Sequence, residues 1–348
     1  GTTIAADFAD TGTHDYLMIF IDDGAPTEIS LGTGLTNYIL ATGLADTTHK
    51  IEIVKKTEPY DGHVTFGGFY LDDGKSLVTP PSLPSLKFEF YGDSNPSGYA
   101  CESIFDAGDD LYKNAYYAYP GVVSRMLNAQ YASTAWGGIG ISKTTTILDD
   151  VWDRTVPNNS TPVWNFNNFI PDCVVINVAA NDYYWNATQS EIMTGWESFV
   201  TDNLRTVYPN AHIVFANSIG WAINEPADYL PLTVQNLHNA GDTNVSYVLF
   251  PWLWGGSHAV VEEHAGFSNI LAAHIANELG LPAPTPDPLD CLGGPGELYN
   301  GDFEMVPIGN DRENQASGWR EWRNNGTIST VVTDAAGAYS GSRYAELS

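Results

Sequence analysis

Hydrophobic and polar residues are arranged in two different patterns, which change near residue 85. Before this point, short apolar runs are separated by turn residues: the run at 16–21 is followed by Asp-Asp-Gly, and the run at 50–54 follows a polar loop. Short runs bounded by turns are typical of antiparallel strands. The first part of the chain therefore predicts an antiparallel β-sandwich of jelly-roll-like form.

From 86 to 281, apolar strands alternate with helical patterns. The runs at 86–91, 174–178 and 211–216 indicate buried strands. The segment 190–207 places its large apolar residues near one face, and 260–279 is also helix-like. Such alternation is typical of a parallel sheet with helices on both faces. We expect a three-layer α/β/α domain here.

Proline-rich segments mark the boundaries between these parts. Pro80, Pro81 and Pro84 form a stiff linker, and a second one starts with Pro-Ala-Pro-Thr-Pro-Asp-Pro at 282–288. The expected domains are 1–85 (β-sandwich), 86–281 (α/β domain), 282–296 (linker) and 297–348. The last segment is too short to bury a core of its own, and its sequence resembles the start of a β-sandwich module.

Composition and charge restrict the possible partners. With 43% hydrophobic and 12% aromatic residues among 348, the chain has the composition of a folded globular protein. Its 42 acidic and 14 basic residues give a net charge of −28. Such a surface repels phosphate groups and anionic lipids, so neither nucleic acid nor a membrane is an expected partner. No apolar run is long enough to span a bilayer, and the Gly-Thr-Thr start predicts a processed or trimmed soluble protein.

Three cysteines, Cys101, Cys173 and Cys291, are too widely spaced for a metal-binding or redox motif. Cys173 opens an apolar strand and is expected to be a core residue. Cys101 and Cys291 lie in turn-rich segments, which leaves a disulfide between them open. His258 and Glu262 have no third metal ligand that can be identified in the sequence. We therefore predict no metal and no cofactor.

Candidate chemistry starts at Gly92-Asp93-Ser94, directly after the strand 86–91. This position delivers Ser94 to the carboxyl end of a strand, where open α/β sheets bind ligands. Gly92 permits a tight turn there, and Asp93 is expected to fix it by accepting backbone N–H bonds. An ordinary β-turn is the alternative.

Three further segments follow in order. Ala-Trp-Gly-Gly-Ile-Gly at 135–140 offers backbone N–H groups to an anion, Asn181 follows the strand 174–178, and His258 precedes the last helix. Ester hydrolysis through a serine needs a nucleophile, a base and donors for the developing oxyanion. These segments contain one candidate for each part.

In this order, Ser94, Gly138, Asn181 and His258 resemble the four blocks of the SGNH, or GDSL, hydrolases. The chain is similar to carbohydrate esterase family two over most of 1–280. The similarity rests on the β-rich segments 51–58 and 67–72 and on residues 135–140, which resemble that family's Ala-Trp-Ser-Gly-x-Gly block. The resemblance implies a secreted, extracellular enzyme that removes O-acetyl groups from polysaccharides or oligosaccharides of xylan or glucomannan type. It also implies that 297–348 is part of a carbohydrate-binding module.

The resemblance implies a role for each residue. Ser94 is the nucleophile, His258 the base, and the N–H groups of Ser94 and Gly138 with the Asn181 amide form the oxyanion hole. Asn181 as a simple turn cap is the alternative. Trp185 and Trp254 are candidates for stacking on sugar rings, with a place in the core as their alternative.

The sequence departs from the family pattern beside the histidine. The usual acidic residue two or three positions earlier is replaced by Gly256 and Gly255, which implies a Ser-His dyad with a main-chain carbonyl orienting the imidazole. Ala259 stands where the family has proline, and His264 is a competing base that is expected inside the last helix. Two alternatives remain: a non-catalytic carbohydrate-binding protein on a decayed esterase scaffold, and a lipase or thioesterase of the same superfamily.

Overall fold

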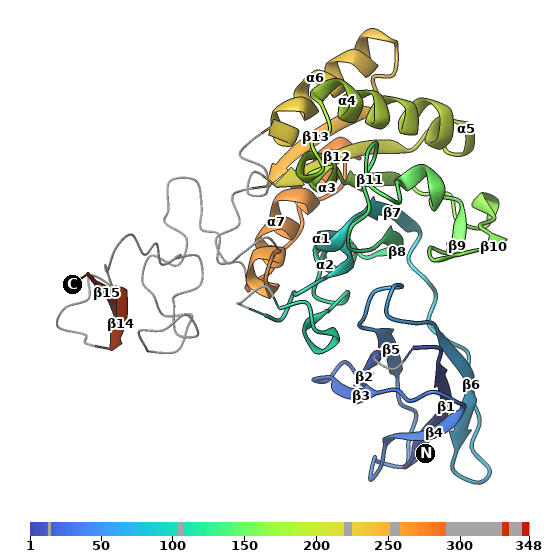
Figure 1. Cartoon of the computed structure of the whole chain (residues 1–348). Coiled ribbons are helices and arrows are strands. Elements are labelled where there is room, and N and C mark those ends of the chain that lie inside the picture. The colour runs from blue at the N-terminus through green and yellow to red at the C-terminus, as the bar shows by residue number, and fades with distance from the viewer. Residues whose placement is uncertain are drawn as a thin grey trace.

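The computed structural model describes residues 1–12, 15–103, 107–218, 225–250, 258–289, 329–333 and 343–347 (Figure 1). Antiparallel sheets at the N-terminus are followed by a parallel sheet with helices on both of its faces. The predicted fold class is therefore confirmed.

The N-terminal part consists of two three-stranded antiparallel sheets, with strand orders β4-β1-β6 and β3-β2-β5. Their strands are β1 (Ile4–Asp10), β2 (Tyr16–Ile21), β3 (Thr27–Ser30), β4 (Thr36–Ala41), β5 (Ile51–Lys55) and β6 (Val64–Leu71). Because side chains alternate between the faces of a strand, each sheet turns one apolar face inward. The buried residues of the shared core are Ala6, Phe8, Leu17, Ile19, Leu31 and Leu40.

The second part is built on a five-stranded parallel sheet of order β13-β12-β11-β7-β8. Its strands are β7 (Leu86–Gly92), β8 (Ala129–Ala135), β11 (Cys173–Asn177), β12 (His212–Ser218) and β13 (Val245–Phe250). All five residues of β11 are buried, as expected for a central strand that is covered on both faces. The antiparallel pair β9 (Arg154–Val156) and β10 (Asn159–Val163) lies outside this sheet.

Helices form the two outer layers. α2 (Tyr119–Met126) and α7 (Val261–Glu278) cover one face, where Val123 and Phe267 pack against Phe88 and Val175. α4 (Gln189–Ser198) and α6 (Glu225–Asn239) cover the other. α4 continues through a π-helical segment, Phe199–Leu204, into α5 (Arg205–Val207), so the helix expected at 190–207 is present with a change of winding. The short helices α1 (Ser94–Ser97) and α3 (Ala180–Tyr184) follow strand ends.

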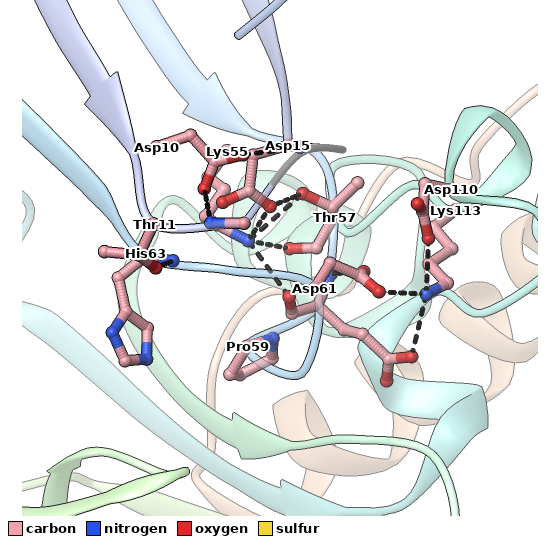
Figure 2. A network of polar contacts seen from close by, with 12 residues as sticks. Asp10, Thr11, Asp15, Lys55, Thr57, Pro59, Asp61, His63, Asp110 and Lys113 are labelled. Carbon is pink, nitrogen blue, oxygen red and sulfur yellow. Dashed lines mark hydrogen bonds and ion pairs between the residues drawn. The ribbon is translucent and has the colours of Figure 1, made fainter. Parts of the chain in front are cut away.

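Buried ion pairs join the two parts. The ammonium of Lys113 contacts Asp61, Asp110 at 3.0 Å and Glu58 at 3.2 Å, and only 5% of its side chain is exposed. Figure 2 shows Lys113 between Asp61 and Asp110. Lys56 makes a second bridge to Glu102 at 2.6 Å. The N-terminal sheets are thus fixed against the α/β domain by paired charges.

The region after α7 is described by the structure only in part. Asp287 donates its N–H to Oδ1 of Asn269 in α7 at 2.7 Å, so the start of the proline-rich linker is held against the helix. β14 (Ser329–Thr333) and β15 (Arg343–Leu347) form an antiparallel pair, while the rest of the expected C-terminal module lies outside the described residues.

The thiols of Cys101 and Cys173 are free and buried. The disulfide left open from the sequence is therefore not formed by Cys101, and Cys291 lies outside the described residues. Among the described helices, none combines the length and apolar composition needed to cross a membrane.

Candidate active site

The carboxyl ends of three neighbouring strands meet at one edge of the parallel sheet. Gly92, the last residue of β7, lies opposite Ala135 of β8 and Asn177 of β11. The chain runs from β7 to β8 on one side and then crosses to β11 on the other, so β7 is where the strand order reverses. Loops at such a point form the ligand crevice of open α/β sheets. Three residues identified from the sequence follow these strand ends: Ser94, Gly138 and Asn181.

Ser94 is the first residue of α1 and is almost fully buried. Gly92 is needed for close approach: a Cβ atom on it would stand 2.5 Å from the carbonyl oxygen of Asn177. Asp93 caps the helix, since its carboxylate accepts the N–H of Asn95 at 3.1 Å. Burial raises the pKa of Asp93 to about 7. The serine is thus held by tight backbone packing and by a side-chain cap.

His258 lies beside Ser94, although the two are 164 positions apart in the sequence. Its Nε2 is 2.8 Å from Ser94 Oγ, the distance expected between a nucleophile and its base. The N–H of Ala259 donates to Oδ1 of Asn95 at 3.0 Å, and the Tyr99 ring packs on the imidazole with centroids 4.6 Å apart. Residues next to the serine in sequence therefore also fix the histidine.

The competing histidine, His264, is fully buried inside α7. Its Nδ1 accepts the N–H of Tyr119 at 3.3 Å. Burial lowers the pKa of His264 to about 3, so this imidazole is neutral at ordinary pH. It is a core residue, and of these two histidines the structure places His258 at the serine.

The loop after β8 passes close to Ser94. Gly138 has a φ of 87°, which glycine adopts without strain, and apart from its chain neighbours no described residue has an atom within 4 Å of the place where its Cβ would stand. A Cβ on the preceding Gly137 would be 3.7 Å from the Cβ of Ser94. The backbone of these two glycines therefore borders the space next to Ser94.

Asp182 organises the continuation of this loop. Its buried carboxylate accepts the N–H groups of Ile141 at 2.8 Å, Ser142 at 2.7 Å and Lys143 at 2.8 Å. Hydrogen bonds to an ionised acceptor are stronger than neutral ones. The loop is thus tied to α3, the helix that also carries Asn181.

Asn181 follows an unusual backbone turn at Ala179, whose φ of 119° is rare for a residue with a side chain. Nδ2 of Asn181 donates to the carbonyl of Ile139 at 2.9 Å. An amide nitrogen carries two hydrogens, and one of them makes this bond. The Asn181 side chain therefore bonds the loop that contains Gly138, and it does not act as a simple turn cap.

Trp185 directly follows α3 and is 58% exposed. This exposure excludes a place in the core for Trp185, and stacking on a sugar ring stays a prediction for it. Trp254 lies outside the described residues, as do Gly255 and Gly256. Orientation of His258 by a main-chain carbonyl therefore stays a prediction.

Two carboxylates at this edge of the sheet were not predicted from the sequence. Asp182 could have been found, because it directly follows Asn181 in the same turn. Glu58 could not: it comes from the N-terminal domain and accepts the N–H of Gly137 at 2.7 Å. No local sequence pattern shows that a residue of the N-terminal domain contacts a loop of the α/β domain.

Two family models match the chain. Residues 1–81 match the carbohydrate esterase 2 N-terminal domain, and residues 90–280 match the GDSL-like lipase/acylhydrolase family. The two matches together cover the antiparallel sheets and the α/β domain.

Similar proteins agree with these matches. Cellulase/esterase CelE of Acetivibrio thermocellus is 28% identical over 287 residues, which are 78% of this chain and 35% of that protein. An acetylxylan esterase/glucomannan deacetylase of Cellvibrio japonicus is 24% identical over 292 residues, 79% of this chain and 80% of that protein.

Among solved structures, a family two carbohydrate esterase from Clostridium thermocellum in complex with cellohexaose superposes with a TM-score of 0.76 at 28% identity. The match covers 80% of this chain and 90% of that one. This chain spans about a third of CelE and most of the other two proteins. With Ser94 and His258 in contact at the switch point of the sheet, the chain belongs to the GDSL-like lipase/acylhydrolase, or SGNH, family, and its relatives there are family two carbohydrate esterases.

Proposed function

We propose that this protein is a serine esterase that removes O-acetyl groups from polysaccharides through a Ser-His pair. The observation that carries the proposal is the 2.8 Å contact between His258 Nε2 and Ser94 Oγ. It lies at the strand edge that is followed by Gly138 and by Asn181, whose amide donates to Ile139 in the same loop as Gly138. In this proposal the four residues supply a nucleophile, its base and donors for an oxyanion to one reacting carbonyl.

In the first half of the reaction, Ser94 Oγ attacks the acetyl carbonyl carbon and its proton passes to His258 Nε2. The carbonyl oxygen becomes an oxyanion, which accepts hydrogen bonds from the N–H groups of Ser94 and Gly138 and from the Asn181 amide. When the tetrahedral intermediate collapses, the sugar hydroxyl leaves with the proton from His258. The product is an acetyl-serine ester.

In the second half, water attacks the acetyl-serine while His258 accepts its proton. The same donors stabilise the second oxyanion. Collapse returns the proton to Ser94 Oγ and releases acetate. The reaction consumes one water and needs no metal or cofactor in any step.

The substrate class is proposed from the relatives and from the site. The similar proteins are an acetylxylan esterase/glucomannan deacetylase and an esterase solved with cellohexaose. The exposed Trp185 offers a flat apolar surface beside Asn181 on which a sugar ring can stack. Acetylated xylan and glucomannan are the substrates we expect, and because such polymers are extracellular, we propose that the protein acts outside the cell.

The test is acetate release from acetylated xylan, acetylated glucomannan and 4-nitrophenyl acetate by the protein and three variants. Ser94→Ala and His258→Ala should each lower kcat by about 10³-fold or more, because the nucleophile and its base act in the same step and neither is effective without the other. His264→Gln keeps an acceptor for the Tyr119 N–H and should retain most activity.

Each alternative gives a different result. No acetate release by the folded wild-type protein, with retained polysaccharide binding, would support the non-catalytic carbohydrate-binding protein. A preference for long-chain over acetyl 4-nitrophenyl esters would support the lipase. Loss of activity in His264→Gln but not in His258→Ala would show that the base is misassigned.

A further inference from the structure

Glu58 of the N-terminal domain reaches the loop that borders the nucleophile. It lies three residues after β5 and is only 4% exposed. Its Oε2 accepts the N–H of Gly137 at 2.7 Å and the hydroxyl of Ser97 at 3.3 Å. One carboxylate from the N-terminal domain thus contacts both α1, which begins with Ser94, and the loop after β8.

The loop after β8 has three separate anchors. Glu58 holds residue 137, the amide of Asn181 holds Ile139, and Asp182 holds residues 141–143. Gly138, the expected oxyanion donor, lies between the first two anchors. The N–H of Gly138 belongs to the peptide unit between two glycines, whose backbone has wide conformational freedom. The hydrogen bond to the N–H of Gly137 removes much of this freedom on the Gly137 side of the peptide unit.

The charge of Glu58 makes this anchor a strong one. Its other oxygen, Oε1, is 3.2 Å from the Lys113 ammonium, which supplies the opposite charge inside the interface. A hydrogen bond to an ionised carboxylate is shorter and about twice as strong as a neutral one. The Gly137 contact at 2.7 Å fits this description.

We propose that Glu58 is a positioning residue for the oxyanion hole, so that the N-terminal β-sandwich supplies part of the working active site. The proposal rests on the esterase function proposed above. Glu58 does not contact the reacting atoms; it acts through Gly137 by setting the direction of the Gly138 N–H. Its effect therefore belongs to the transition state, where charge develops on the substrate oxygen.

The test compares kcat and KM of Glu58→Ala and Glu58→Gln with the wild type on 4-nitrophenyl acetate. Glu58→Ala should lower kcat by about tenfold to a hundredfold with KM nearly unchanged, which is less than the loss of about 10²- to 10³-fold expected when a direct oxyanion donor is removed. Glu58→Gln should recover part of this loss, because its side-chain oxygen can still accept the Gly137 N–H.

Glu102→Gln is the matched control. It weakens another ion pair between the two domains, the 2.6 Å contact with the buried Lys56, without touching the loop. It should lower the free energy of unfolding about as much as Glu58→Gln while kcat stays within twofold of the wild type. The proposal is overturned if folded Glu58→Ala keeps wild-type kcat, or if Glu102→Gln loses as much kcat as Glu58→Gln.

A second readout does not depend on esterase activity. Amide hydrogen exchange of residues 136–140 should become faster in Glu58→Ala and stay unchanged in Glu102→Gln, because only the first variant removes the acceptor of the Gly137 N–H. Unchanged exchange in Glu58→Ala would overturn the proposal even for an active enzyme. A wild-type protein without activity, combined with faster exchange in Glu58→Ala, would refute the esterase function and leave the anchor in place.

Discussion

Glu89 is a buried acid within a central strand. It lies in the middle of β7, is 3% exposed, and accepts the Tyr91 hydroxyl at 2.8 Å. Burial raises the pKa of Glu89 to about 7 from an ordinary value of 4.5. A group whose pKa is raised on folding binds its proton more tightly in the native state. The stability that it contributes is full below about pH 4.5 and is lost as the pH rises through about 7.

We therefore expect Glu89→Gln to change the pH dependence of stability. The difference in free energy of unfolding between the variant and the wild type should shift by about 2 kcal/mol in favour of the variant from pH 5 to pH 8. The reason is that the wild type loses the proton of Glu89 in this range, whereas glutamine has no proton to lose. Urea unfolding of both proteins at the two pH values measures the difference. An equal difference at pH 5 and pH 8 would mean that Glu89 does not titrate in this range.

At the scale of elements, the turn from β11 into α3 carries backbone strain. Ala179 has a φ of 119° directly before the helix that contains Asn181 and Asp182. Such a conformation costs about 1–3 kcal/mol for a residue other than glycine. It redirects the chain immediately beyond the strand end, which brings Asn181 to the loop after β8.

Replacing each of two neighbouring alanines by glycine tests this strain. Ala179→Gly should leave the free energy of unfolding within about 0.5 kcal/mol of the wild type, since relief of strain offsets the lost methyl group and the more flexible unfolded chain. Ala180→Gly, at the first residue of α3 and without a positive φ to relieve, should lower it by about 1 kcal/mol. Similar losses in both variants, measured by urea unfolding, would show that Ala179 is not strained.

How much of the site the sequence predicts depends on whether the signal is local. Ser94 and Asn181 follow apolar strands, so the strand pattern places both at one edge of the sheet. The approach of Gly92 to Asn177 and the φ of Ala179 depend on neighbours across the sheet, and no short pattern encodes them. The link from Glu58 to Gly137 joins two domains and has no local signal at all.

At the scale of the whole molecule, the interface between the domains depends on a buried cation. Lys113 faces the carboxylates of Glu58, Asp61 and Asp110. Burial raises the pKa of Asp61 to about 6 even with Lys113 beside it. Removing the cation leaves three carboxylates facing one another away from water, which is costly.

We expect Lys113→Met to lower the free energy of unfolding by about 3–5 kcal/mol at pH 8. The control is Lys75→Met, which removes a 2.6 Å pair with Asp46 whose two side chains are 40% and 57% exposed. It should cost less than about 1 kcal/mol. Thermal and urea unfolding of both variants measure the contrast, and equal losses would contradict a special role for the buried lysine.

The hydrogen bond from Gly137 to Glu58 also has a consequence for the order of events during folding. The N-terminal sheets are synthesised first and can fold while the later strands are still emerging. The contact closes only after the α/β domain has formed and the two units have docked, a step that is slower than the collapse of either unit. Catalytic competence should therefore be among the last properties that a newly made chain acquires, after its secondary structure and its separate cores are complete.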